Sequence, residues 1–254
     1  MKKILSIARY TLIENIRNRV FYILILFGVI IIGASLLLAA LSGEQQQRLL
    51  LDLGFSAIEF FALLTIVFGS VTLILEELES KTIYLILTRP LSRGAYLIGR
   101  FAGLLAAVYC GMLIMSGMHL GILFLKGWAF TARYPLALLL SAEKITLIGS
   151  VALFFSLFSS SAISSISFTL FFWIIGHFSE ELHFLSAKLT YIVPQMLAKA
   201  AYYLAPNLQY FNLRDFWDVP HIAGSWIGAA SLYGILYSSF CVALAILFFR
   251  KREF

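Results

Sequence analysis

Runs of apolar residues long enough to cross a bilayer recur along the chain, and they constrain its fold more than any other feature. A helix of about 20 residues crosses the roughly 30 Å hydrocarbon core of a membrane. A helix also satisfies its own backbone hydrogen bonds, as lipid requires. We therefore predict an all-α polytopic membrane protein with six transmembrane helices. The predicted spans are Val20–Leu41, Gly54–Leu75, Tyr96–Leu125, Leu136–Phe158, Ala162–Gly176 and Ser225–Phe249.

The composition excludes several classes of protein. Of the 254 residues, 61% are hydrophobic and 13% are charged, whereas soluble domains carry about 25% charged residues. A soluble enzyme, a nucleic-acid-binding domain and a disordered chain are therefore excluded. The net charge of +6 fits basic loops held against anionic lipid better than it fits nucleic acid. Cys110 and Cys241 fall inside apolar runs, where they are expected to be packing residues.

Residues 1–19 are predicted to form an interfacial helix before the first span. Ile4, Ala8 and Leu12 share one side of the helix and Arg9 lies opposite, a pattern typical of helices that lie in the membrane surface. The alternative is that this segment is only the basic flank of the first span.

The distribution of basic residues predicts the orientation in the membrane. Twelve of the nineteen Lys and Arg residues lie in the N-terminal segment, around the segment between spans two and three, or in the C-terminal tail. Basic residues concentrate on the cytoplasmic side. We therefore predict an inner-membrane protein with both termini in the cytoplasm.

The segment 177–224 is too polar and too long for a simple loop. It contains an apolar stretch, Leu189–Leu204, that is interrupted by Pro194. Such a stretch is too short and too broken to span. We predict short re-entrant helices that dip into the outer leaflet, where surrounding protein must cover any irregular backbone.

Motifs for catalysis are absent from the sequence. It contains no G-x-x-x-x-G-K-[ST], no H-E-x-x-H, no G-x-S-x-G and no C-x-x-C. We therefore expect no catalytic residue, no metal site and no cofactor in this chain, which we predict is not an enzyme.

Polar residues inside spans are functional candidates by default. Glu143 and Lys144 are adjacent, so their side chains diverge by about 100° on a helix and do not simply neutralise each other. The alternative is a fourth span that begins near Lys144, with 136–142 at the interface. His119 is expected to be a hydrogen-bonding residue between helices. The predicted intramembrane polar sites are Glu59, His119, Glu143 and Lys144.

Two histidines and two glutamates follow the fifth predicted span and invite a copper or zinc interpretation. His177, Glu180 and Glu181 share a helical face, but His183 points away from it. We favour ordinary polar surface over a metal site.

The stretch Glu76–Phe101 is the most informative in the chain. Acidic residues are followed by a short apolar helix over about 80–87, and Pro90 disfavours helix at Arg89. A plain hairpin between two spans would need only a few polar residues. We interpret 76–93 as a docking element for a cytosolic partner; the alternative is a connector that lies on lipid.

This stretch resembles the membrane subunits of type-2 ABC exporters, also called type V exporters. The segments IARYTLIENIRNR, IIGH and APNLQYFNLRD resemble the same family, and the resemblance covers nearly the whole chain. It is strongest to permeases associated with multicopper-enzyme maturation. The residues that carry the main motif are Glu77, Glu79, Thr82, Ile83–Leu87, Thr88, Pro90, Leu91, Arg93, Gly94, Gly99, Arg100 and Phe101.

The resemblance implies a subunit of an exporter that forms the substrate pathway. Two copies of the chain would each dock on a separate cytosolic ATPase, which would hold the ATP and Mg, and the short helices before span six would form an outer gate. The resemblance does not distinguish a homodimer from a heterodimer, and it does not identify the substrate. The alternative function is a non-transporting scaffold or maturation factor for an exported metalloenzyme. The implied ATPase-coupling residues are Glu76, Glu77, Glu79, Thr82, Leu85, Ile86, Arg89, Pro90 and Arg93.

Overall fold

The computed structural model describes residues 2–40, 46–79, 92–159, 161–189, 191–216 and 224–251, and the regular elements in these ranges are all helical. In chain order they are α1 (Lys2–Arg17), α2 (Arg19–Ala40), α3 (Gln46–Glu79), α5 (Arg93–Leu125), α6 (Arg133–Phe158), α7 (Ala162–His177), α8 (Ser179–Lys188), α9 (Ile192–Leu204), η2 (Gln209–Phe211), η3 (Leu213–Phe216) and α10 (Gly224–Lys251).

Five helices in the described part of the chain are long and apolar enough to cross a membrane. They are α2, α3 over Gln46–Leu75, α5, α6 and α10. α7 and α8 pass the same test together, but the pair is bent by 71°. The described residues therefore contain five candidate spans, or six if the bent pair is one broken span.

The fifth predicted span, Ala162–Gly176, is too short to cross a membrane by itself. α7 has 16 residues, which is about 24 Å of helix against a hydrocarbon core of roughly 30 Å. The carbonyl of Gly176 accepts hydrogen bonds from the hydroxyl of Ser179, at 2.8 Å, and from the backbone N–H of Leu208, at 3.0 Å. These bonds satisfy the carbonyl at the bend, so the helix can break there.

The second predicted span begins earlier than its apolar pattern suggested. We predicted that the span begins at Gly54, after polar residues, but α3 begins at Gln46. Arg48 and Asp52 form an i,i+4 ion pair, with 3.9 Å between the Nε and Oδ2 atoms, which supports the first turns of the helix. Leu50 is fully buried, so the first turns of α3 also contribute to the core.

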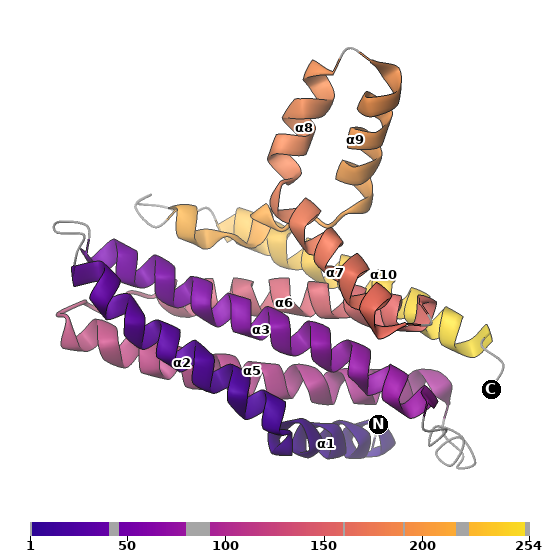
Figure 1. Cartoon of the computed structure of the whole chain (residues 1–254), viewed down its shortest axis with the longest axis horizontal. Helices are drawn as coiled ribbons and strands as arrows, with labels where there is room; N and C mark the ends of the chain where they lie inside the picture. The colour runs from indigo at the N-terminus through magenta and orange to yellow at the C-terminus, as the bar shows by residue number, and fades with distance from the viewer. Residues whose placement is uncertain are drawn as a thin grey trace.

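The long helices form a bundle in which α6 is central. α6 packs against α3 on one side and α10 on the other, and α2 and α5 both pack against α3. The start of α1, the end of α3, the start of α5 and the end of α10 lie toward the same end of the long axis (Figure 1). α6 is continuous from Arg133, so Glu143 and Lys144 lie in its interior.

Two glycines near the start of α5 allow α1 to lie directly on it. A Cβ atom at Gly99 would lie 2.9 Å from the Cβ of Ile7, and one at Gly103 would lie 2.6 Å from the Cβ of Thr11. The spacing of small residues favours close helix contact but does not identify the neighbour. The structure identifies it as α1 of the same chain.

The α8–α9 hairpin projects away from the bundle (Figure 1). Pro194 does not break α9, because it lies in the first turn, where its missing N–H has no helical partner to lose. The apolar side chains that α9 and the residue before it leave exposed are Tyr191, Ile192, Val193, Met196, Leu197, Tyr203 and Leu204.

Candidate functional site

A buried ion pair joins α3 to α6. Glu59 comes from α3 and is 7% exposed, and Lys144 comes from α6 and is 2% exposed. The Nζ of Lys144 contacts the Oε1 of Glu59. Burial of Lys144 without Glu59 would cost several kcal/mol, of order 3–5. The pair therefore fixes the register between two central helices.

A third charged side chain reaches Glu59 from a distant part of the sequence. Arg214, in η3, lies with its Nη2 3.0 Å from the Oε2 of Glu59. Its Nη1 donates a hydrogen bond of 2.7 Å to the hydroxyl of Ser56. Each carboxylate oxygen of Glu59 thus faces a different cation. We call Glu59, Lys144 and Arg214 the Glu59 cluster.

His177 lies at the edge of the Glu59 cluster. Its Nε2 is 3.8 Å from the Oε1 of Glu59, and its Nδ1 lies 3.0 Å from the backbone carbonyl of Trp173. A carbonyl can only accept, so Nδ1 carries a proton. Nε2 therefore pairs with the carboxylate only when the imidazole is doubly protonated.

The residues that carry Arg214 are bound to three other helices. We call 205–216 the outer strap. Its Gln209 side chain donates to the carbonyl of His177 at 2.5 Å, and its Asn207 N–H donates to the hydroxyl of Tyr233 on α10 at 2.9 Å. Gly176 leaves room for the strap, because a Cβ there would lie 2.5 Å from the carbonyl oxygen of Pro206. The strap therefore ties α7 and α10 to the Glu59 cluster.

The other members of the histidine–glutamate set do not join the cluster. Glu180 and Glu181 are exposed in the first turn of α8. The ring of His183 lies against that of Tyr202 in a tilted arrangement, with 5.2 Å between centroids. Among the described residues, no group of three His, Cys, Asp or Glu side chains could hold a metal ion.

His119 is completely buried in α5 and hydrogen-bonds through both ring nitrogens. Its Nδ1 lies 2.9 Å from the hydroxyl of Tyr134, and its Nε2 lies 3.1 Å from the carbonyl of Leu50. Gly54 faces the ring so closely that any added side chain would overlap it. His119 therefore links α5, α6 and the start of α3.

Glu143 points away from Lys144, as expected for adjacent helical residues. It lines a cavity between α5, α6 and α10, together with Tyr109, Thr146 and Ser239. The two neighbours in sequence thus serve two separate places in the bundle.

Most of the predicted ATPase-coupling residues lie outside the described part of the chain. Thr82, Leu85, Ile86, Arg89 and Pro90 belong to this group. Glu76, Glu77 and Glu79 lie in the last turns of α3. Arg93 is described: its Nη1 donates to the carbonyls of Phe249 and Arg250, at 3.2 Å each, and so caps the end of α10.

Part of the chain is similar to a known permease. No protein-family model matches the chain. The chain is similar to the probable ABC transporter permease protein NosY of Stutzerimonas stutzeri, with 34% identity over 154 residues. The match covers 51% of this chain and 52% of that protein, so the chain spans about half the length of the relative. Similarity to a permease and several helices of transmembrane length fit a multi-pass membrane protein of the transporter class.

Proposed function

We propose that the chain is the transmembrane subunit of an ABC exporter in the inner membrane. The observation that carries this proposal is the similarity to the NosY permease, together with the five or six candidate spans in the described part of the chain. Because the sequence holds no phosphate-binding loop, the ATP would be hydrolysed by a separate cytosolic subunit.

The proposed assembly contains two copies of the chain and two ATPase subunits. The type V pattern around Pro90 and Arg93 supports this arrangement. In it, α1 lies at the cytoplasmic interface, and 76–93 docks on the ATPase.

The outer strap and the Glu59 cluster would act together as the outer closure of the pathway. The side chain of Arg214 is 20% exposed. Arg214 can therefore separate from Glu59 and enter solvent without passing through the core. Separation of the strap from α3 would break the Arg214–Glu59 contact while Lys144 keeps Glu59 neutralised. The cluster can therefore open in one step and stay charge-balanced.

Docking through residues 80–87 predicts that Ile86→Asp abolishes co-purification of the ATPase. A helix seated in a groove depends mainly on its apolar anchors. The double change Glu77→Lys with Glu79→Lys should weaken docking less, since exposed ion pairs contribute about 0.2–1 kcal/mol each.

The measurement is ATPase recovery and ATP hydrolysis by the reconstituted complex. Leu125→Asp is the control, because Leu125 is equally apolar, 88% exposed and far from this segment in sequence. If the complex with Ile86→Asp hydrolyses ATP at the rate of the parent complex, residues 80–87 are only a connector that lies on lipid.

The proposed topology predicts the labelling pattern of single cysteines in a background without Cys110 and Cys241. A cysteine at position 86 should be protected from an impermeant reagent in intact cells, because 76–93 is cytoplasmic. A cysteine in place of Tyr191, which is 79% exposed before α9, should react. Reaction at position 86 together with protection at position 191 would show that the orientation in the membrane is the opposite of the proposed one.

A further inference from the structure

Glu143 lines a cavity of about 300 Å³ between α5, α6 and α10 that is open to the surface of the bundle. α5 contributes Tyr109, α6 contributes Glu143 and Thr146, and α10 contributes Ser238 and Ser239. Every one of these side chains carries a hydrogen-bonding oxygen. Ile235 and Gly234 complete the lining, so the cavity is polar on one side only, within helices of transmembrane length.

One carboxylate oxygen of Glu143 has no partner in the part of the chain that the structure describes. Its Oε2 is shielded from solvent and accepts no hydrogen bond there. Glu59, by contrast, faces Lys144 and Arg214. An unpaired buried acceptor is destabilising, and more so when it is charged. Glu143 thus provides a negative charge that a bound cation would neutralise.

The hydroxyl groups beside Glu143 also present acceptors. Thr146 donates its single proton to the carbonyl of Ala142, at 2.8 Å. In the contact between the hydroxyls of Tyr109 and Thr146, Tyr109 must therefore be the donor. The Tyr109 oxygen keeps lone pairs with which it can accept. The cavity accordingly suits a group with several N–H donors and a positive charge.

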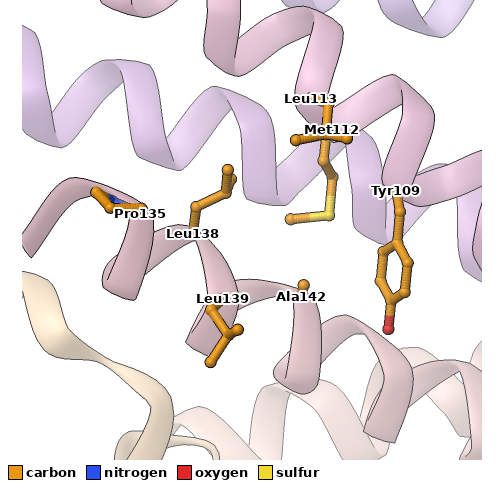
Figure 2. A pocket seen from close by; sticks show the side chains of 7 residues that line it. All are labelled: Tyr109, Met112, Leu113, Pro135, Leu138, Leu139 and Ala142. Atoms are coloured by element: carbon orange, nitrogen blue, oxygen red, sulfur yellow. The ribbon is translucent and has the colours of Figure 1, made fainter. Parts of the chain in front are cut away.

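An apolar cavity of about 250 Å³ adjoins this polar one, and Tyr109 borders both. Figure 2 shows Met112 and Leu138 directed into the apolar cavity, with the Tyr109 ring at the end away from Pro135. At about 30 Å³ for each water-sized group, the volume holds an alkyl chain of roughly eight carbons.

We infer that these two cavities together bind a protonated primary amine with an apolar tail. The ammonium group has three N–H donors and no acceptor, so it matches Glu143 and Tyr109. The tail would fill the space lined by Met112, Leu138 and Leu139. A quaternary ammonium lacks the N–H donors, and a carboxylate would be repelled by Glu143. This inference concerns binding alone and does not depend on the proposed transport function.

Octylamine is the probe, and the full chain in phosphatidylcholine nanodiscs is the sample. Binding of radiolabelled octylamine should be saturable above the background of empty discs. Glu143→Gln should weaken it by about tenfold or more, because the ammonium would lose its charge-assisted hydrogen bond. Glu181→Gln, which removes the same charge from an exposed position on α8, should leave the affinity unchanged. Octanol and octanoate should not compete.

A second variant keeps the test decisive if Glu143→Gln does not fold. Ser239 lines the polar cavity and is exposed, so Ser239→Phe should fold and block the amine. Loss of octylamine binding in phosphatidylethanolamine discs would identify the lipid headgroup as the amine, and retained binding would identify a free amine. Equal affinity of the parent, Glu143→Gln and Ser239→Phe would overturn the inference, as would tight competition by octanol.

Discussion

Replacement of Glu59 by methionine should destabilise the protein by about 3–5 kcal/mol, because it leaves two cations in the bundle without their carboxylate. Lys144 is buried at 2% exposure and cannot reach solvent without disruption of α6. Lys144→Met should cost less, since Glu59 keeps its contact with Arg214 at 3.0 Å. The measurement is the free energy of unfolding from detergent titration of the purified protein.

The double variant separates charge from packing. Glu59→Met with Lys144→Met removes both buried charges and should recover most of the stability that Glu59→Met loses. Arg214 is partly exposed and can turn toward solvent. Glu181→Met is the matched control on the exposed face of α8 and should change stability by less than about 0.5 kcal/mol. A double variant as unstable as the single one would show that the ion pair is not the source of the effect.

Gly103→Val should detach α1 from α5 at a cost of about 1–3 kcal/mol, because the new side chain would overlap Thr11 and the backbone of Ala8. The contacts of Arg100 with Glu14 and with Thr11 would be lost at the same time. Hydrogen exchange should increase over residues 2–17 while α3 and α6 stay protected.

Gly117→Val is the control for the loss of helical glycine. Gly117 lies in the same helix, and a Cβ atom there would have no neighbour within 4 Å. The change in helix propensity is the same at both positions. Equal loss of α1 protection in both variants would contradict the close packing of α1 at Gly103.

Much of the fold follows from hydrophobic patterning, and its errors have physical causes. The long apolar runs predict α2, α5, α6 and α10 to within a few residues. The predicted end of the fifth span at Gly176 lies within one residue of the end of α7, but the bonds that permit the bend there come from Ser179 and Leu208 and could not be predicted. The early start of α3 was also missed, since Arg48 and Asp52 resemble loop residues until their i,i+4 pairing is considered.

The candidate site was predictable only in part. Glu59, Lys144 and Glu143 stand out because charges are rare within apolar spans. That Lys144 pairs with Glu59 and not with Glu143 depends on which helices pack together. Arg214 is 155 residues from Glu59 and lies in a polar segment where arginine is unremarkable. The segment APNLQYFNLRD was a signal for the outer strap, but it did not indicate which residues the strap contacts.

The central claim is that this chain works as a membrane subunit with a separate ATPase. The most direct measurement is native mass spectrometry of the tagged full chain, purified from its own membranes and assayed for ATP hydrolysis. We expect two copies of the chain with two copies of an ATPase that carries a phosphate-binding loop, and ATP hydrolysis by that complex. A folded chain recovered repeatedly without any such ATPase, as expected of a scaffold, would contradict it.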